Sequence, residues 1–264
     1  MSARCTVCGS GALAPHLAVA GTAGDAGLIP TTDRFGTALA DIVRCPLCSH
    51  MQLATMPSVE SLSEAYGEAS SLDYVEEEEG QRATARRTLD RLVPLAAAPD
   101  QQPQSAAAWA GGPPSVRILD LGCWVGFLLS EAERRGWRAE GVEPSSFAAT
   151  YARERLGLSV QQADLFEAEL DAGSYSAIVM ADVIEHLIDP GAALRRCREL
   201  LAPGGKLALV LPDAGSPLAR LMGERWWSVI PTHVQYFTRA SLTRLLGREG
   251  FEVLDRDTSP KAFT

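Results

Sequence analysis

The sequence VRILDLGCWVGFLL joins an apolar, strand-like run to a helical segment through a turn that contains Gly122 and Gly126. Backbone N–H groups at the start of a helix attract anions and polar groups, and glycine lets a ligand approach the backbone. The dinucleotide template G-x-G-x-x-G would require glycine at two positions where Trp124 and Phe127 stand. A second template, acidic-x-G-x-G-x-G, is met at Asp120, Gly122 and Gly126 and is missed only at Trp124. The stretch therefore predicts a nucleotide-binding loop, although a tight strand–helix turn without a ligand would have the same local pattern.

Two further carboxylates close the next two strand-like segments. Glu143 ends a strand in GVEPS, and Asp164 ends another in QQADLF. A carboxylate at the position of Glu143 can accept hydrogen bonds from both ribose hydroxyls, and one at Asp164 can accept from the exocyclic amine of adenine. Each could instead cap the helix that follows it. Acids at the ends of three successive strands are a narrower coincidence than any one of them, so together they favour a nucleotide-containing ligand.

Four of the six cysteines form two C-x2-C pairs, CTVC and CPLC. Each pair can supply two thiolates to one tetrahedral zinc ion, and four sulfur ligands leave no open position for chemistry. The alternative is four buried or free thiols, and the long spacer between the pairs must fold as an insert. His16 and His50 are spare candidate ligands that we interpret as surface residues. We predict a structural zinc site at Cys5, Cys8, Cys45 and Cys48.

These residues need a scaffold, and strands alternate with helical segments from residue 116 onward. This βαβ rhythm predicts an α/β fold: a Rossmann-like, doubly wound, mostly parallel sheet, preceded by a small zinc-ribbon module and a helical segment. Ligands of such sheets bind at the carboxyl ends of the strands. Strands are expected at residues 116–122, 138–144, 159–164, 175–182, 206–213 and 251–257, and helices at 127–136, 145–157, 190–205 and 241–250.

Composition limits the class of partner. Lys and Arg total 24 and Asp and Glu total 33, which gives a formal charge of −9. That balance argues against a nucleic-acid binder, whose affinity comes mainly from basic residues that neutralise phosphates. The apolar runs are too short to cross a bilayer, and MSARCTVCGS has no apolar signal core, so we expect a cytoplasmic protein without a membrane partner. No pattern in the sequence fixes an oligomeric state.

Five motifs, in the order DLGCWVG, GVEPS, ADLF, ADVIEHLIDP and LLAPGGKLALVLP, resemble those of class I S-adenosylmethionine-dependent methyltransferases. The resemblance covers about residues 116 to 258. It implies that S-adenosylmethionine is the methyl donor and S-adenosylhomocysteine the product. Asp120 and the Gly122–Gly126 loop would hold the methionine part, Glu143 the ribose, and Asp164 with Leu165 the adenine. The remaining cofactor-binding residues expected are Cys123 and Trp124 in the loop, Pro144 beside Glu143, Met180 and Ala181 near the sulfonium, and Tyr74.

Trp124 is the departure from the family's pattern. It puts in doubt the close approach of the ligand at that one position. We expect its backbone to keep the path of the loop, and its ring to point away from the cofactor, toward the helical segment or the linker. An indole that filled the cofactor cavity would favour a non-catalytic protein that kept the fold as a scaffold.

A four-cysteine module ahead of this domain resembles two groups of methyltransferases. One contains sugar C-methyltransferases and related natural-product enzymes, and the other contains ribosomal RNA guanine methyltransferases with a zinc finger. The long spacer and the net acidity favour the first group. The function expected is methyl transfer to carbon or oxygen of a small molecule, a sugar or secondary-metabolite intermediate. The alternatives are RNA base methylation and a non-catalytic binding protein.

Methyl transfer to a weakly acidic carbon or hydroxyl needs a base of near-neutral pKa, and histidine suits that role. Only four histidines are present, and two of them lie in or beside the cysteine module. The other two are His186, in DVIEHLIDP after the fourth strand, and His233, in WWSVIPTHVQYFT after the fifth. We expect His233, His186 and Glu185 to form the catalytic group. Their alternative roles are framing the pocket and packing a hydrophobic loop.

The chain is expected to divide into four consecutive parts. Tyr66 and Tyr74 lie in the second part, where they could cover the cofactor or simply pack between helices. Only TSPKAFT follows the sixth strand, so the seventh strand normal in the family is expected to be missing or truncated. The parts are a zinc-binding module at 1–56, a helical lid or connector at 57–92, a flexible linker at 93–115 and a methyltransferase domain at 116–264.

Overall fold

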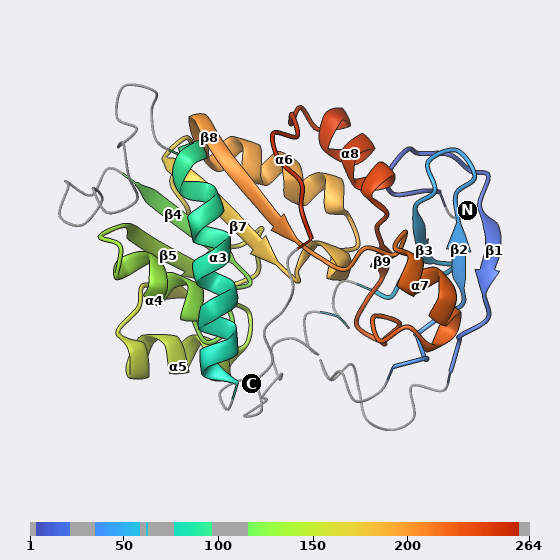
Figure 1. Cartoon of the computed structure of the whole chain (residues 1–264), viewed down its shortest axis with the longest axis horizontal. Coiled ribbons are helices and arrows are strands. Elements are labelled where there is room, and N and C mark those ends of the chain that lie inside the picture. Colours follow the sequence, from blue (N-terminus) through green and yellow to red (C-terminus); the bar gives the residue numbers. More distant parts are fainter. Residues whose placement is uncertain (1–3, 22–34, 59–61, 63–76, 97–115, 259–264) are drawn as a thin grey trace. The chain divides into compact units, whose positions relative to one another are not determined.

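The computed structural model describes residues 4–21, 35–58, 62, 77–96 and 116–258 (Figure 1). Its contacts divide the chain into two compact units made of interleaved segments. The predicted division follows the chain in order, whereas the contacts group two late segments with the cysteine module. We call the two sets of segments the N-terminal unit, Met1–Gly67, Asp182–Arg195 and Leu211–Arg256, and the sheet unit, Glu68–Ala181, Arg196–Val210 and Asp257–Thr264.

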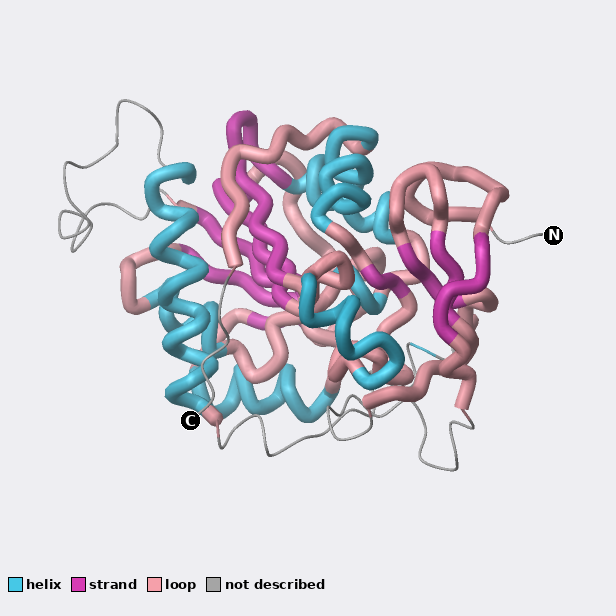
Figure 2. Tube along the Cα trace, turned by 45° about the vertical axis from the view of Figure 1, so that its right-hand side comes forward, coloured by secondary structure: helices cyan, strands magenta, loops and turns pink. Residues whose placement is uncertain are grey.

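The N-terminal unit is built on a four-stranded antiparallel sheet (Figure 2). Its fourth strand, β9, comes from the segment that follows the parallel sheet in sequence, and Tyr236 of β9 pairs with Met51 of β3. The sheet therefore gains its fourth strand only when β3, near the start of the chain, pairs with β9, near its end. Its order is β1-β2-β3-β9, with β1 at Ala14–Leu17, β2 at Ile42–Arg44, β3 at Met51–Leu53 and β9 at Gln235–Tyr236.

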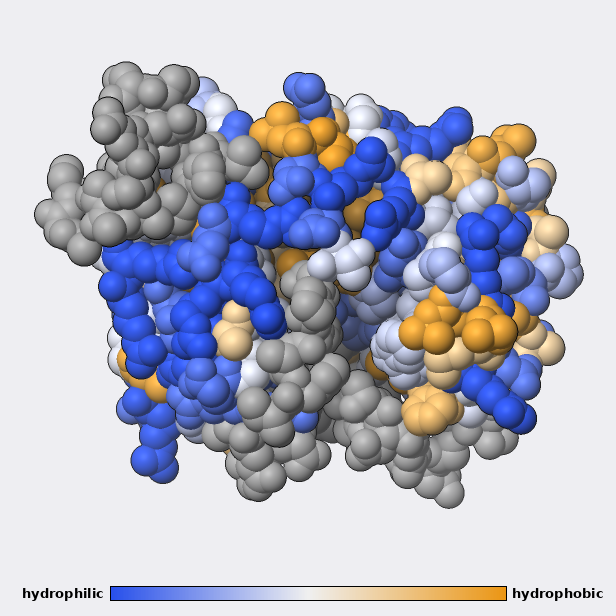
Figure 3. All heavy atoms as spheres, in the orientation of Figure 1, coloured by the Kyte–Doolittle hydropathy of each residue, from blue (hydrophilic) through white to orange (hydrophobic). Residues whose placement is uncertain are grey.

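Short helices complete the N-terminal unit. Ser216 and Thr238 cap α7 and α8 by accepting from the backbone N–H groups three residues ahead. Hydrophobic residues gather on the outer surface of α7, where Leu218 and Leu221 are exposed (Figure 3). The elements are the 3-10 helices η2 at Ile184–His186 and η3 at Gly223–Arg225, and the α-helices α7 at Pro217–Met222 and α8 at Arg239–Arg248.

The sheet unit holds a five-stranded, all-parallel sheet, which confirms the predicted α/β, Rossmann-like fold. The chain runs outward from β4 to β5 and β6, then returns to the other side of β4 for β7 and β8. The strand order thus reverses beside β4, and ligands of such sheets bind at that switch point, outside the carboxyl ends. The order is β6-β5-β4-β7-β8, with β4 at Arg117–Leu121, β5 at Arg138–Val142, β6 at Val160–Gln161, β7 at Tyr175–Ala181 and β8 at Leu201–Val210.

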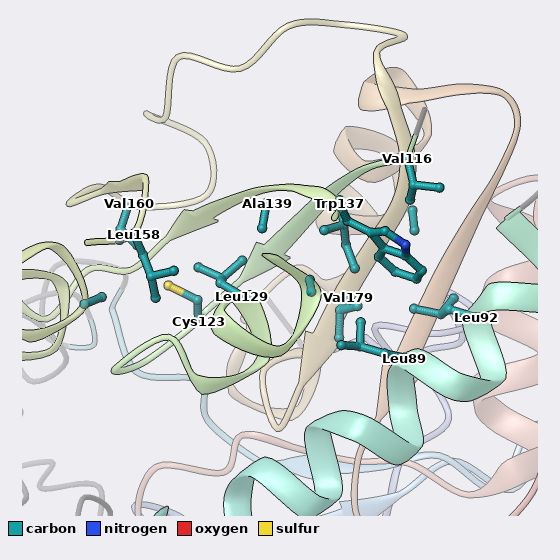
Figure 4. Close-up of a cluster of buried hydrophobic side chains, with 14 of the residues drawn as sticks. Leu89, Leu92, Val116, Cys123, Leu129, Trp137, Ala139, Leu158, Val160 and Val179 are labelled. Carbon is teal, nitrogen blue, oxygen red and sulfur yellow. The ribbon is translucent and has the colours of Figure 1, made fainter. Parts of the chain in front are cut away.

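One hydrophobic core packs the helices of the sheet unit onto these strands (Figure 4). Leu89 and Leu92 from α3 and Leu129 from α4 are buried in it, beside Val179 of β7. A Cβ atom added at Gly141 would lie 2.6 Å from both Cys123 Sγ and Leu129 Cδ1, so glycine lets β5 approach the loop after β4. The helices are α3 at Glu78–Ala96, α4 at Phe127–Glu133 and α5 at Ser146–Leu156, while α6, at Pro190–Leu200, begins in the N-terminal unit.

Several predicted boundaries are wrong. Residues 251–258 form no strand; Phe251 and Val253 alternate with exposed residues but are only half-buried, and the segment pairs with no strand of the described part of the chain. The helix expected at 190–205 ends at Leu200, because Leu201 already pairs with Tyr175 at the start of β8. Helix α3 continues beyond the predicted connector, to Ala96. Tyr66, Tyr74 and residues 97–115 lie outside the described residues. In the described part of the chain, no helix is long and apolar enough to span a membrane.

Candidate functional site

The loop between β4 and α4 has left-handed backbone at three alternating residues. The φ angles are 74° at Gly122, 48° at Trp124 and 88° at Gly126. These are the three positions at which the acidic-x-G-x-G-x-G template asks for glycine, so the backbone keeps the template's path despite the tryptophan. A non-glycine residue in this region costs roughly 1–2 kcal/mol. Trp124 is therefore held in a conformation that its own side chain disfavours.

Glu143 supplies the contact that holds Trp124. Its two carboxylate oxygens accept from the backbone N–H of Trp124, at 2.9 Å, and from that of Ser145, at 2.8 Å. Burial raises the pKa of Glu143, and these two N–H groups oppose the rise. Each carboxylate oxygen can accept a second hydrogen bond. The acid thus fixes the loop and still has acceptor capacity for a ligand.

Asp120 lies at the carboxyl end of β4 and is fully buried. Burial, followed by the negative charge of Glu143, raises the pKa of Asp120 to about 7. Among the described residues, neither acid forms an ion pair with a basic side chain, and two such buried acids are costly in the unliganded protein. A cationic ligand group would relieve both the desolvation and the repulsion, so the site is electrostatically suited to a positively charged group.

The indole of Trp124 packs over α5, with its centroid 6.4 Å from that of the Phe147 ring. It belongs to a small apolar cluster with Val125, Phe127 and Ala148. Among the described residues its neighbour is therefore α5, whereas the linker and most of the helical segment that we predicted as its neighbours lie outside them. The expected backbone path is present in the structure.

The other expected cofactor residues follow the next strands of the same sheet. Asp164 accepts from the backbone N–H of Phe166 at 2.8 Å within a turn, and no helix follows it that it could cap. Ala163, just before it, donates to the carbonyl of Glu143 at 3.3 Å and so ties the two strand ends together. Leu165, Cys123 and Met180 are buried, whereas Pro144 and Ala181 are partly exposed.

The four N-terminal cysteines converge as predicted. Cys5 Sγ lies 3.5 Å from Cys48 Sγ, and Cys8 Sγ lies 3.5 Å from Cys45 Sγ. All four sulfur atoms lie within 4.8 Å of one another. These separations are too long for disulfides, whose S–S bond is about 2.05 Å. Sulfurs bound to one tetrahedral zinc, at about 2.3 Å each, would be roughly 3.8 Å apart, so the cluster fits such an ion.

A buried polar network links the first cysteine pair to β9. Gln235 Oε1 accepts from Thr6 Oγ1 at 2.9 Å and lies 2.8 Å from His50 Nε2. Gln235 Nε2 donates to the carbonyls of Leu187 at 3.0 Å and Ile188 at 3.2 Å. His50 is fully buried, so its interpretation as a surface residue is wrong, and burial lowers its pKa to about 4.

Sequence reasoning missed Gln235 and Arg248 as structural residues of this module. The Arg248 guanidinium, on α8, donates to the backbone carbonyls of Thr6 and Val7. Both residues lie far from the cysteines in sequence, and a single glutamine or arginine carries no local pattern. Gln235 reaches the cysteine pair through the pairing of β3 with β9, and Arg248 reaches it from α8.

Glu185, His186 and His233 also converge, within the N-terminal unit. Their ligand atoms lie within 4.8 Å of one another, and the two imidazole centroids are 4.6 Å apart. His186 Nδ1 donates to the Thr232 carbonyl at 2.9 Å, and His233 Nδ1 donates to the Ser228 carbonyl at 2.8 Å. Because carbonyls only accept, these bonds place the proton on Nδ1 and the lone pair on Nε2. The group can therefore accept a proton or hold a divalent cation.

A family model for a methyltransferase domain matches residues 79–256. The chain therefore belongs to the methyltransferase domain family, which confirms the resemblance drawn from its motifs. A solved S-adenosylmethionine-dependent methyltransferase from Archaeoglobus fulgidus has the same fold, with a TM-score of 0.52 and 18% identity. That match covers 69% of this chain and 75% of the other.

Curated relatives are named ubiquinone biosynthesis O-methyltransferase. One from Caulobacter sp. (strain K31) is 38% identical over 97 residues, which are 34% of this chain and 38% of the relative. One from Aeromonas salmonicida (strain A449) is 31% identical over 160 residues, 55% of this chain and 67% of the relative. The matches to the first relatives span about two fifths of their length, 38% to 43%. The family implies S-adenosylmethionine as the cofactor.

Replacing Gln235 with leucine tests the network beneath the cysteine pair. Gln235→Leu should lower the free energy of unfolding by about 2–3 kcal/mol, because it leaves buried partners unsatisfied. The amide hydrogens of β3 should exchange faster, and the midpoint of unfolding should shift to a lower urea concentration. The control is Gln162→Leu, the same change at an exposed position. Equal midpoints for the two variants would contradict the role given to Gln235.

Proposed function

We propose that this protein transfers the methyl group of S-adenosylmethionine to a small molecule, at oxygen or carbon. The observation that carries this proposal is the β4–α4 loop, in which Glu143 holds Trp124 in the glycine-like path beside buried Asp120. Oxygen is the favoured acceptor atom, because the curated relatives are named O-methyltransferases. A sugar or secondary-metabolite intermediate is the acceptor class that the cysteine module suggests.

The acids of the sheet unit would divide the cofactor between them. Asp120 would pair with the ammonium of the methionine part, beside the backbone of the Gly122–Gly126 loop. Glu143 would accept from the ribose hydroxyls with its remaining lone pairs, and Asp164 from the adenine amine. Cys123, Trp124, Pro144, Leu165, Met180 and Ala181 would complete the walls.

When bound, S-adenosylmethionine supplies an electrophilic methyl group that needs no further activation. The residues of this chain must then align the acceptor and remove its proton. We assign the proton to Nε2 of His233, because the Ser228 carbonyl fixes that ring with its lone pair on Nε2. The proton leaves the acceptor as its oxygen forms the new bond to carbon. His186 and Glu185 would orient His233 and stabilise the imidazolium that results.

We further propose that the four cysteines hold one structural zinc ion. Four thiolates fill a tetrahedral shell, so the ion would have no open position for a substrate. Its role would be to fix the CTVC turn, whose Thr6 joins the network of Gln235. Through that network, zinc would support the carbonyls of Leu187 and Ile188, which directly follow His186 in the chain.

Binding of S-adenosylhomocysteine should depend on pH through Asp120. The pKa of Asp120 is raised to about 7 in the unliganded protein, and an ammonium group pairs only with the ionised carboxylate. Affinity should therefore fall as pH falls, roughly tenfold between pH 8 and pH 6. Isothermal titration calorimetry measures this. Asp120→Asn should bind more weakly and lose the pH dependence, whereas exposed Glu154→Gln should match the wild type. No binding at any pH would refute the cofactor site.

A substitution at His233 distinguishes an effect on cofactor binding from an effect on proton transfer. His233→Asn should leave S-adenosylhomocysteine affinity unchanged and lower kcat by roughly 100-fold or more, in line with the loss of a general base. The measurement is S-adenosylhomocysteine formed with a panel of hydroxylated aromatic and sugar acceptors. Chelator-treated enzyme with and without added Mg²⁺ tests the cation role of the same atoms. Turnover that survives in His233→Asn would exclude His233 as the base.

Metal content tests the cysteine cluster. Purified protein should contain about one zinc per chain, and Cys45→Ser should lose it, because three sulfurs bind zinc less tightly than four. Cys197→Ser, a change at a buried cysteine outside the cluster, should retain the metal. Absence of zinc from protein purified without chelators, or its retention in Cys45→Ser, would contradict the assignment.

A further inference from the structure

The N-terminal unit contains a pocket of about 350 Å³ that none of the roles above uses. Its walls are apolar and buried: Ile42 is 1% exposed, Val229 1% and Trp226 5%. The volume is in the range of small-molecule sites, which combine apolar walls with a few polar groups. The polar and charged residues that line it are His16, Arg44, Arg220, Thr238 and Tyr236.

The register of the antiparallel sheet places the pocket and the cysteine network on opposite faces of the sheet. Arg44 lies opposite Met51, and Met51 lies opposite Tyr236, so these three side chains share one face, which lines the pocket. Gln52 lies opposite Gln235, and both belong to the other face. Gln52 accepts there from the backbone N–H of Thr6. One sheet thus separates a structural polar network from a ligand-sized apolar pocket.

The pocket's charge is positive. Arg44, from β2, and Arg220, from α7, both line it and are both exposed, which places them at its mouth. Among the described residues, neither guanidinium lies within ion-pair distance of a carboxylate. Arginine forks match carboxylate and phosphate groups in geometry as well as charge. An apolar wall with two such groups at its mouth fits an amphipathic anion.

One lining residue, Tyr236, lies near the proposed base. The Tyr236 ring centroid lies 6.4 Å from that of His233, and Tyr236 follows His233 by three residues. His233 itself does not line the pocket, so Tyr236 is the residue that connects the pocket with the imidazole to which we assign the proton. Neighbouring α7 exposes Leu218 and Leu221 next to Ala219 and Arg220, which line the pocket, so a longer apolar ligand would meet further apolar surface.

We infer that this pocket binds the methyl acceptor, and that the acceptor is an organic anion with an apolar or aromatic body and a carboxylate or phosphate end. The statement that the bound molecule is the methyl acceptor rests on the proposed function, whereas the binding of an organic anion in this pocket does not. Arg44 and Arg220 would hold the anionic end, and the apolar walls and Tyr236 would hold the body. A neutral sugar would leave both guanidinium groups without a partner.

Calorimetry with three matched probes tests the charge requirement. Naphthalene-2-carboxylate and 2-naphthyl phosphate should bind at least tenfold more tightly than neutral 2-naphthalenemethanol, and the stronger of the two anions identifies the end group. Arg44→Gln and Arg220→Gln should each weaken the anions about fivefold or more and leave the neutral probe unchanged. Both arginines are exposed, so the variants should fold. Arg244→Gln, an exposed change on α8 outside the pocket, should bind like the wild type.

Equal affinity for the neutral and anionic probes, or unchanged anion binding in both arginine variants, would overturn the inference. S-adenosylhomocysteine binding, measured on the same samples, keeps the two proposals apart. If S-adenosylhomocysteine binds and the anions do not, only the assignment of the pocket fails. If the anions bind and the product does not, the methyltransferase proposal fails and the pocket remains an anion site.

Discussion

The buried amide of Gln235 is the contact on which the N-terminal unit depends. Its oxygen faces Thr6 and His50, and its nitrogen donates to two carbonyls that follow η2. A buried amide that lost these partners would be strongly destabilising, so its four contacts must form together. They join three parts of the chain, which are the cysteine module, the segment that follows β7, and strand β9. The three segments of this unit are therefore joined by one side chain in addition to their shared hydrophobic core.

This arrangement changes what the cysteine cluster can do. A zinc ion at the cysteines would act on the CTVC turn, and that turn touches the same glutamine that orders the residues after His186. The pairing of Met51 with Tyr236 extends the effect along β9 toward His233. A structural metal would thus support the rigidity of the residues to which we assign proton transfer, while its four sulfur ligands would leave it no open position for chemistry.

The sequence predicts best what depends on local pattern. Alternating strands and helices, the glycine turn and the C-x2-C pairs each have a short signature, and the parallel sheet and the converging cysteines follow from them. Residues 251–257 show the limit: their composition is strand-like, yet a strand needs a neighbour and a buried face. Gln235 and Arg248 could not be found in this way, because their roles arise from a pairing between the two ends of the chain.

The conformation of Trp124 depends both on its local loop and on a residue distant in sequence. Its left-handed backbone is unfavourable for any residue with a side chain, and Glu143, nineteen residues later, holds it there with one hydrogen bond. Burial, and after it the charge of the same acid, raises the pKa of Asp120. Glu143 thus stabilises the loop's path while its charge makes the unliganded site unfavourable for a second carboxylate. A cationic ligand beside Asp120, as proposed above, would remove that repulsion and leave the hydrogen bond intact. Tryptophan can stand where the template asks for glycine because Glu143 holds its backbone, and a bound cation would stabilise the same site further.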